Sequence, residues 1–293
     1  MILVVESGST KADWMLIKDG QNTPYTTKGF NPFFHSKEDI LIELNDHLEL
    51  DLIKNDITKI YFYGAGCSSK KLNAIIENGL KAFFTKATIQ VDHDLKACAV
   101  SLYEKKPIIA CILGTGSNSC FFDGKEITEN SHALGYILGD EGSGSYFGKS
   151  ILSAYLYGRL PEKMMTEMNR LGLNKEIIFE NVYMKEDANV YIASFMPVLI
   201  RNKELDFCQK IIQKGFLEFI DKHVLCYPEA QKSTISFVGS VASLLKDELE
   251  QACLSKGLSI GKVIRRPLEN LVNYHLSPES MKTENFNIKI NKN

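Results

Sequence analysis

The chain has 293 residues, a formal net charge of −2 and 44% hydrophobic residues. This length exceeds that of a typical single domain and predicts two domains with sizeable cores. The charge shows no basic excess, so the composition gives no indication of nucleic acid or an anionic membrane surface as a partner. We find no leader segment and no apolar run long enough to span a bilayer, which predicts a cytoplasmic protein. The seven cysteines are scattered without zinc-type spacing and are expected to be reduced core thiols.

The chain opens with a predicted β-hairpin. Strands are expected at residues 2–5 and 12–17, with small residues at the tip between them. Such residues let backbone N–H groups approach an anion, so the tip is a candidate phosphate loop. Glu6, at the end of the first strand, is a candidate Mg²⁺ ligand through water. Taken alone, the stretch is better explained as an ordinary turn.

Strands and helices then alternate, which predicts an α/β fold. Helices are expected at residues 37–50, 70–84 and 95–103, and strands at 59–63 and 88–91. Asn31 precedes a proline and has an exposed amide, although such residues are usually turn formers. Asp94 lies between a strand and a helix, where it could be a helix N-cap or could face a ligand at the sheet edge.

A second strand-turn-strand loop follows in the middle of the chain. The apolar strand at residues 108–113 runs into Gly114-Thr115-Gly116-Ser117-Asn118, and a returning strand at 119–122 ends in an Asp123-Gly124 turn. This loop is a second candidate phosphate site. Two such loops in one chain predict a duplicated nucleotide-binding architecture.

A glycine cluster at residues 139–145 precedes a predicted helix at 146–157. Its carboxylates, Asp140 and Glu141, could complement the helix dipole, but beside the phosphate loop we favour Asp140 as an acceptor for a polyhydroxy ligand. Residues 143–150 nearly match a P-loop, except that Ser143 stands where the first glycine is required. We therefore reject a P-loop and expect Lys149 to be a solvated helix lysine.

The remainder is predicted to be mostly helical up to residue 225. Among the expected helices are long ones at residues 189–200 and 205–225. A strand at 233–238 runs into Gly239-Ser240 and a helix at 243–255, followed by a strand at 262–266 and a closing helix at 268–274. Residues 277–293 are polar and are expected to form a loose tail.

Five segments resemble, in order and spacing, the nucleotide-binding motifs of the actin/hexokinase/heat-shock-70 ATPase superfamily: residues 6–10, Asp94, 114–118, 139–143 and 237–242. More narrowly, the chain is similar to the BadF/BadG/BcrA/BcrD ATPase family and its N-acetylglucosamine kinase members. The resemblance implies two ribonuclease H-like α/β domains that face each other across a nucleotide cleft. The expected boundaries are 1–110 and 111–276, with the tail at 277–293.

The same resemblance implies ATP-dependent phosphorylation of an amino sugar, first of all N-acetylglucosamine to its 6-phosphate, with ATP and Mg²⁺. It implies Asp94 as the catalytic base and Glu6 as the metal residue, although Asp is usual at position 6. The positions implied for ATP are Gly8, Ser9, Thr10, Lys11, Gly114, Thr115, Gly239 and Ser240. Those implied for the sugar are Asn31, Ser117, Asn118, Gly135 and Asp140.

Other functions stay open at this point. The family also contains ATPases that activate 2-hydroxyacyl-CoA dehydratases or reductases through a [4Fe–4S] cluster, which needs cysteines near the domain junction. Cys111 and Cys120 lie there, but Cys111 is expected inside a buried strand, so we favour the kinase. A sugar sensor without turnover is disfavoured by the candidate base. The residues do not decide among N-acetylglucosamine, N-acetylmuramic acid and glucosamine, or between a monomer and a homodimer.

Overall fold

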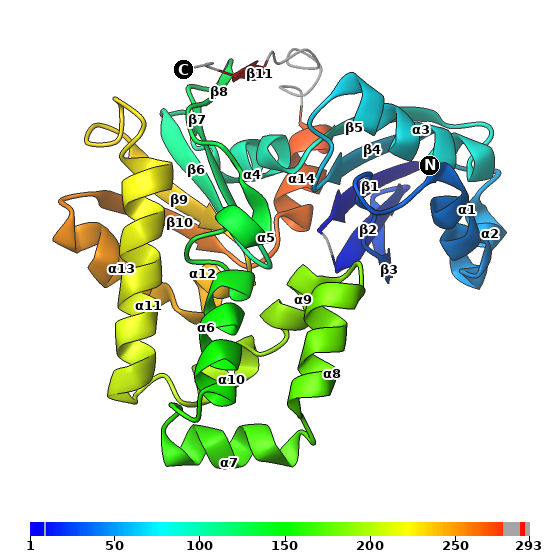
Figure 1. Cartoon of the computed structure of the whole chain (residues 1–293). Coiled ribbons are helices and arrows are strands. Elements are labelled where there is room, and N and C mark those ends of the chain that lie inside the picture. The colour runs from blue at the N-terminus through cyan, green and yellow to red at the C-terminus, as the bar shows by residue number, and fades with distance from the viewer. Residues whose placement is uncertain (9, 278–287, 291–293) are drawn as a thin grey trace. The chain divides into compact units, whose positions relative to one another are not determined.

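The computed structural model describes residues 1–8, 10–277 and 288–290 (Figure 1). The chain divides into two compact units, each with its own β-sheet. Unit 1 comprises Met1–Ser101 and the segment that begins at Pro267, and unit 2 comprises Leu102–Arg266 and the short strand β11 (Ile288–Ile290). The predicted two-domain α/β architecture is confirmed.

The sheet of unit 1 has five strands in the order β3-β2-β1-β4-β5. The first three strands form an antiparallel meander, and β1, β4 and β5 run parallel. The central strand β1 has apolar residues on both faces, and Leu3, Val4 and Val5 are fully buried. The strands are β1 (Ile2–Ser7), β2 (Lys11–Lys18), β3 (Gln21–Lys28), β4 (Lys59–Gly64) and β5 (Thr88–His93).

The helices of unit 1 are α1 (Lys37–Asn45), α2 (Leu48–Ile53), α3 (Lys70–Phe83), α4 (Asp94–Leu102), which runs one residue past the unit's boundary, and α14 (Leu268–Leu276). The single helix predicted at residues 37–50 is wrong, because α1 ends at Asn45 and His47 caps a new helix by accepting a hydrogen bond from the Leu50 N–H. Helix α14, drawn in orange-red in Figure 1, packs on β1 and β2.

The sheet of unit 2 repeats this topology. Its order is β10-β9-β6-β7-β8-β11, with β6, β7 and β8 antiparallel and β6, β9 and β10 parallel. The strands β10-β9-β6-β7-β8 therefore correspond one by one to β5-β4-β1-β2-β3, so the predicted duplication is present in the chain. The strands are β6 (Ile108–Leu113), β7 (Ser117–Phe122), β8 (Ile127–Glu129), β9 (Thr234–Val238) and β10 (Ser259–Ile264).

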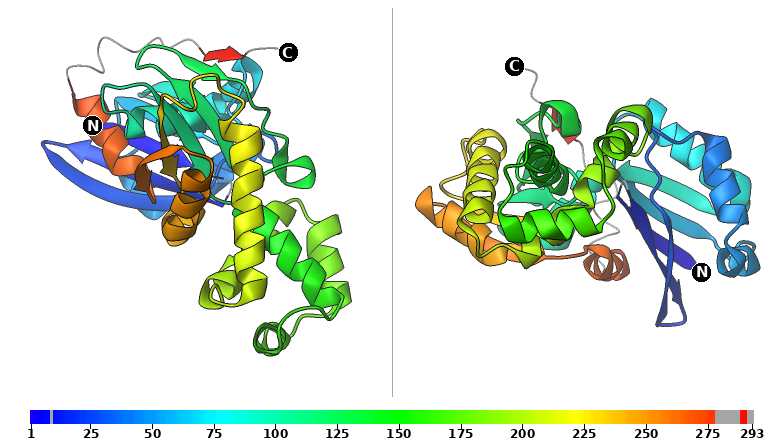
Figure 2. Two further views of the ribbon diagram at one scale, coloured as in Figure 1. Left: turned by 90° about the vertical axis from the view of Figure 1, so that its left-hand side faces the viewer. Right: turned by 60° about the horizontal axis from the view of Figure 1, so that its bottom comes forward.

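Most helices of unit 2 follow β8 in the chain, and in Figures 1 and 2 α7 lies at the end of this helical part that is farthest from the sheet. The long predicted helices are interrupted: residues 189–200 divide at Ser194–Phe195, and a π-helical turn at Ile220–Val224 follows α11. The helices are α5 (Gly135–Leu138), α6 (Gly144–Leu156), α7 (Glu162–Arg170), α8 (Lys175–Phe179), α9 (Ala188–Ala193), α10 (Met196–Arg201), α11 (Asp206–Phe219), α12 (Ser240–Leu244) and α13 (Lys246–Ser255).

The division of the chain differs from the predicted boundaries at two places. Unit 2 begins at Leu102 instead of residue 111, and α14 groups with unit 1 because it packs on that sheet and its Asn270 Nδ2 donates to the Ser101 carbonyl (3.0 Å). Within the predicted tail, 277–293, only Ser277 and β11 are described, and β11 pairs in parallel with β8 rather than being loose. None of the helices that the structure describes is both long and apolar enough to span a membrane.

Candidate active site

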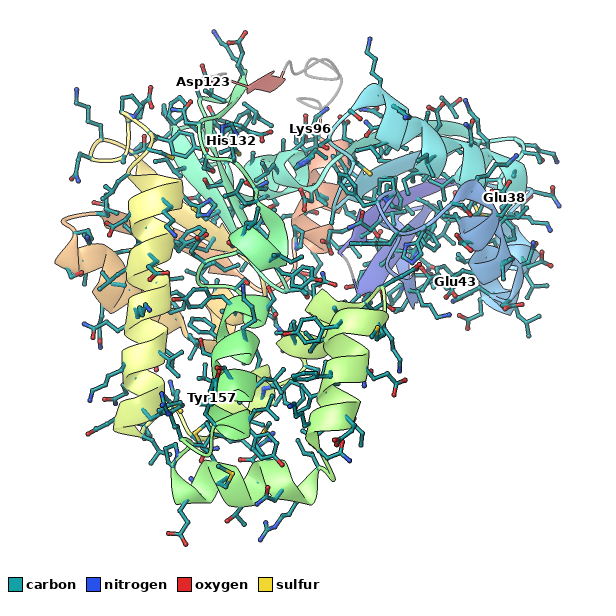
Figure 3. The ribbon with its side chains drawn as sticks, in the orientation of Figure 1. Glu38, Glu43, Lys96, Asp123, His132 and Tyr157 are labelled. Carbon is teal, nitrogen blue, oxygen red and sulfur yellow. The ribbon has the colours of Figure 1, made fainter. Side chains whose placement is uncertain are left out.

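The β6–β7 hairpin places the second predicted phosphate loop at its tip. Leu113 pairs with Ser117 across the two strands, and the Gly114 N–H donates to the Gly116 carbonyl (3.0 Å). A β-carbon added at Gly114 would meet no atom within 4 Å, so the backbone there is open on one side. At the other end of β7, the Asp123 carboxylate accepts from the Lys125 N–H (2.7 Å) and confirms the predicted turn, labelled in Figure 3.

The amino end of α6 braces this loop from a distant part of the sequence. The N–H groups of Gly144 and Ser145 donate to the carbonyls of Gly114 (2.8 Å) and Thr115 (3.0 Å). Helix α6 begins here because Ser143 is its N-cap and accepts from the Tyr146 N–H (3.2 Å). The two glycine clusters of the sequence are thus hydrogen-bonded to each other.

Asp140 turns its carboxylate onto the same loop. Its Oδ1 accepts from the Ser117 N–H (3.1 Å), and a β-carbon at Gly116 would lie only 3.0 Å from Oδ2, so a glycine gives the carboxylate room. The Asp140 backbone has φ +57°, a left-handed conformation that is costly for a residue with a side chain. Burial raises the pKa of Asp140, and the hydrogen bond from Ser117 opposes this effect. Asp140 is therefore a buried acceptor rather than a helix cap.

The neighbouring sugar-site candidates are also buried. Ser117 is 5% exposed, and its hydroxyl has no hydrogen-bond partner among the residues that the structure describes. The Asn118 side-chain oxygen accepts from the Ser119 N–H (2.8 Å). Gly135 opens α5 with φ +71°, and a β-carbon there would meet nothing within 4 Å. Ser117 and Asp140 are in direct contact, and Asn118 follows Ser117 in the chain. The Gly135 carbonyl accepts from the N–H of Gly139 (2.8 Å), the residue before Asp140.

Gly239, at the end of β9, packs against the Leu113–Gly114 backbone of the β6–β7 tip. Its φ of +133° favours glycine, and an added β-carbon would collide with the Leu113 carbonyl. Its N–H donates to the Ile264 carbonyl at the end of β10 (2.9 Å). The predicted ATP positions Gly239 and Ser240 therefore lie directly beside Gly114.

Lys149 is not the solvated lysine that the sequence predicts. It is half-buried, its ammonium group donates to the Tyr136 carbonyl, and burial lowers its pKa while Asp140 and Glu141 oppose that shift. The prediction fails because the acceptor is a backbone carbonyl of α5, thirteen residues earlier, which no local pattern indicates.

The rejection of a P-loop at residues 143–150 fits the local structure. Gly148 allows α6 to approach α9, since a β-carbon there would collide with the Ile192 backbone carbonyl. The Ser150 hydroxyl donates back to the Tyr146 carbonyl one turn earlier (3.3 Å). These residues serve helix packing.

In unit 1, the β1–β2 tip is held within itself. The Gly8 N–H donates to the Lys11 carbonyl (3.0 Å), and Lys11 Nζ lies 2.5 Å from Asp13 Oδ1. Thr10 is exposed, and Ser9 lies outside the described residues. The ATP roles expected for Gly8, Thr10 and Lys11 stay predictions.

The surroundings of Glu6 show whether this residue could hold a magnesium ion. It stands opposite Asp13 in the antiparallel pairing of β1 and β2, so the two carboxylates share one face of the sheet. Asp13 is already paired with Lys11, and the described part of the chain holds no group of three or more His, Cys, Asp and Glu side chains that could bind a metal. This donor set fits a Mg²⁺ ion that keeps most of its water and meets one protein carboxylate.

Asn31 is held at the carboxyl end of β1 and β4. The Phe30 N–H donates to Ser7 Oγ (2.8 Å) at the end of β1, and the Asn31 side-chain oxygen accepts from the Phe33 N–H (3.0 Å). Gly66, just after β4, has φ +79°, and a β-carbon there would collide with the same Asn31 oxygen. The sequence missed the anchoring role of Ser7, whose only local signal is a polar residue closing an apolar strand.

Asp94 begins α4 immediately after β5. Its Oδ1 is buried and accepts no hydrogen bond from the described residues, although it lies 2.8 Å from Nδ1 of His93. That nitrogen accepts from the Leu95 N–H (3.1 Å), so in the neutral ring it carries no proton to donate to Asp94. Asp94 Oδ1 can therefore accept a hydrogen bond from the hydroxyl group of a bound substrate.

Asp92 is different, although it stands two residues away. Its Oδ2 accepts from Lys96 Nζ (2.8 Å) and from Gln90 Nε2 (2.9 Å). Lys96, labelled on α4 in Figure 3, is itself only 4% exposed. The Asp92 carboxylate is therefore committed to a structural ion pair.

No protein-family model matches the chain, and no curated protein matches it. Among solved structures, one from Porphyromonas gingivalis, described as a putative N-acetylglucosamine kinase, is 35% identical with a TM-score of 0.87 and covers 94% of this chain and 98% of its own. Another of the same description, from Chromobacterium violaceum, is 13% identical with a TM-score of 0.61 and covers 93% and 97%.

A ROK family glucokinase from Streptomyces griseus, in complex with glucose and AMPPNP, is 11% identical with a TM-score of 0.53 and covers 93% of this chain and 98% of its own. At that identity the likeness shows the fold alone. The P. gingivalis protein goes further, because its identity extends over nearly the whole of both chains. This chain belongs to the same family as that protein, a family with the two-domain actin/hexokinase-like fold of sugar kinases.

Proposed function

We propose that the protein is an ATP-dependent kinase that phosphorylates an amino sugar, N-acetylglucosamine on its 6-hydroxyl before any other. The observation that carries this proposal is the 35% identity, over 94% of the chain, with a protein described as a putative N-acetylglucosamine kinase. We assign the chain within this fold to the BadF/BadG/BcrA/BcrD ATPases, on the motifs named above.

Asp94 is the proposed catalytic base. A sugar hydroxyl is a weak nucleophile, so a carboxylate must accept its proton as the γ-phosphoryl group leaves ATP. The unpartnered Oδ1 of Asp94 supports this role, and the ion pair of Asp92 with Lys96 argues against the nearest alternative.

ATP is proposed to contact both hairpin tips and the Gly239-Ser240 turn. Open backbone at Gly114 and the hydroxyl of Thr115 supply room and a donor for phosphate oxygens. Mg²⁺, held through water by Glu6, would neutralise charge on the phosphates. The proposed sugar contacts are the side chains of Asn31, Ser117, Asn118 and Asp140, with Gly135 giving backbone access.

The cysteine geometry does not favour the electron-transfer ATPase. On β6 and β7, Cys111 stands opposite Ser119 and Cys120 stands opposite Ala110. Opposite residues of an antiparallel pair share a face and successive residues alternate, so the two thiols point to opposite faces of the sheet. Both are fully buried, and burial raises the pKa of Cys111. They are poorly placed to hold one cluster together.

The test is ADP release by the purified protein with a panel of sugars: N-acetylglucosamine, N-acetylmuramic acid, glucosamine and glucose. We expect the highest kcat/KM with N-acetylglucosamine, and ³¹P NMR of the product should show a 6-phosphate. Equal ADP release with and without every sugar would contradict the kinase. A brown colour with iron–sulfur absorbance after anaerobic purification would support the electron-transfer ATPase instead.

A further inference from the structure

Glu141 follows Asp140 but points into a different part of unit 2. Its side chain is 8% exposed, with Oε1 2.6 Å from Lys222 Nζ and Oε2 3.1 Å from His223 Nε2. Both partners lie about eighty residues later, in the π-helical turn after α11. A buried carboxylate needs such partners, because an unpaired one would lose its hydration without compensation.

His223 is in turn fixed to strand β7. Ser119 Oγ donates to the His223 carbonyl (2.6 Å), and the ring Nδ1 lies 3.2 Å from Ser131 Oγ. The ring also stacks on Phe219, with 5.0 Å between centroids. Ser119 directly follows Asn118, so the partner of Glu141 is anchored next to the proposed sugar-binding residues.

The protonation of this cluster follows from its contacts. Burial lowers the pKa of His223, although Glu141 opposes the shift, so the ring is neutral near pH 7. For Glu141, burial would raise the pKa, but the hydrogen bonds from Lys222 and His223 outweigh it and the pKa is lowered. The consistent arrangement has His223 Nε2–H donating to the Glu141 carboxylate and Nδ1 accepting from the Ser131 hydroxyl.

Ser131, His223 and Glu141 have the connectivity of a nucleophile, a base and an orienting acid. Their surroundings favour a structural cross-link. The His223 ring is 4% exposed, and Ser131 Oγ is also 3.1 Å from Ser119 Oγ. A substrate carbonyl would have to enter between groups that are already hydrogen-bonded.

The cluster matters because Asp140 cannot hold its own conformation cheaply. Its φ of +57° is disfavoured for a residue with a side chain and must be imposed by neighbouring contacts. On one side, Ser117 and the amino end of α6 fix the loop to the β6–β7 tip. On the other side, the Glu141 side chain connects the loop to the turn after α11 through its contacts with Lys222 and His223.

We propose that Glu141 and His223 are positioning residues that hold the Asp140 loop in the conformation required for sugar binding. This inference rests on the proposed sugar kinase function, but the claim that Glu141 and His223 hold the loop can be tested without turnover. Loss of the tie should leave nucleotide binding intact, because Gly114 and Gly239 are held by backbone hydrogen bonds of their own.

The test uses Glu141→Gln, which keeps the size of the side chain but loses its charge, and His223→Gln as a second variant. The matched control is Asp221→Asn, which breaks an ion pair of the same turn with Lys256 (2.6 Å) that does not reach the Asp140 loop. Hydrogen–deuterium exchange of the Ser117 amide, which donates to Asp140 Oδ1 (3.1 Å), and of the Ser143 amide, which donates to the Asp140 carbonyl (3.1 Å), reports the Asp140 loop directly. We expect at least tenfold faster exchange in both Gln variants and wild-type exchange in the control, on the order of one lost charge-assisted hydrogen bond.

Kinetics supply the second arm. The KM for the sugar should rise about tenfold in Glu141→Gln, while the KM for ATP and the kcat stay within about twofold of wild type. A merely destabilising change would lower the melting temperature without this split. Unchanged amide exchange, or faster exchange with an unchanged sugar KM, would overturn the inference. If wild type releases no ADP with any sugar, the proposed function fails, and the exchange arm alone decides whether Glu141 holds the loop.

Discussion

The tip of the β1–β2 hairpin and the tip of the β6–β7 hairpin occupy the same place in the duplicated strand order. In unit 1 the Gly8 N–H finds its acceptor three residues along, on Lys11. In unit 2 the tip at Gly114 receives hydrogen bonds from α6 and is packed against Gly239. One topology thus carries a locally closed tip in one unit and a tip braced by two distant segments in the other.

This difference suggests a division of tasks. Unit 1 presents the Asp94 carboxylate directly after a parallel strand, and its Oδ1 has no hydrogen-bond partner within the described part of the chain. Unit 2 presents a preorganised set of loops around Gly114 and Asp140. We therefore expect substitution of Asp94 to change the rate of the chemical step, and substitutions around Gly114 and Asp140 to change ligand binding.

The largest expected effect is that of Asp94→Asn. The amide keeps the size of the side chain but cannot accept the hydroxyl proton, so kcat should fall about 10²- to 10⁴-fold with sugar and ATP binding nearly unchanged. Isothermal titration and steady-state kinetics measure the two quantities. Asp92→Asn is the matched control, and it should lower stability through the loss of the Lys96 ion pair more than it lowers kcat. A near wild-type kcat in Asp94→Asn would place the base elsewhere.

The second expected effect is on the pH dependence of stability and concerns α14. This helix follows unit 2 in the chain but packs on the sheet of unit 1. The His275 ring stacks on Tyr61 (3.6 Å between centroids) and lies 2.9 Å from the Tyr63 hydroxyl. Burial, with Lys59 and Lys96 nearby, lowers the pKa of His275 from 6.5 to about 4. The unfolded chain therefore binds a proton between these values that the folded chain does not, and stability falls as the pH falls through this window.

The magnitude follows from the shift of the His275 pKa. The free energy of unfolding should drop by about 3 kcal/mol between pH 6.5 and pH 4 from this group. His275→Phe keeps an aromatic ring for stacking and removes the titration. Urea unfolding at several pH values should show a shallower acid loss in the variant, and parallel curves for both proteins would show that His275 does not control the acid stability of α14.

Asn118→Ala and Asp140→Ala test the ligand loops of unit 2. Each removes a buried polar group that we propose as a partner of the sugar, which should weaken sugar binding by roughly 1–3 kcal/mol per group and raise the KM for the sugar more than the KM for ATP. Steady-state kinetics with both substrates varied measure this. If neither variant changes the sugar dependence, the sugar binds elsewhere and the proposed division of tasks is wrong.

Thr115→Val has the smallest expected effect. It removes one hydroxyl donor and keeps the shape, so the KM for ATP should rise by roughly three- to tenfold while the melting temperature stays unchanged. Thr10→Val in the other hairpin makes the comparison direct. A larger effect at position 115 would agree with the braced tip as the principal phosphate contact, and wild-type ATP kinetics in Thr115→Val would remove Thr115 from the site.

Much of the fold followed from local patterns, because the apolar strands and glycine turns of both hairpins are contiguous in sequence. The strand at Ile108–Leu113 was predicted to the residue. Strand β3 was missed, since Gln21–Lys28 is largely polar and lies on the edge of its sheet. Long helices were predicted without the interruptions that tertiary packing imposes.

In the candidate site too, local sequence patterns indicate some residues and miss the contacts between distant parts of the chain. The turn residues around Gly114 and Asp140 could be found in the sequence because each lies in a short polar run between apolar elements. The tie between Glu141 and His223 could not, because a contact between residues so far apart leaves no local pattern. The environment of Lys149 was mispredicted for the same reason, since its acceptor belongs to α5.

The packing of α6 on α9 at Gly148 bears on how activity losses in this chain should be interpreted. Gly148-Lys149-Ser150 resembles the end of a P-loop. A substitution there that lowered activity could therefore be mistaken for the loss of a nucleotide-binding residue. Here a β-carbon at position 148 would collide with the Ile192 backbone carbonyl, so Gly148→Ala would force α6 away from α9. The amino end of α6 holds the Gly114 loop, so damage at position 148 would reach this proposed nucleotide loop indirectly and imitate a binding defect.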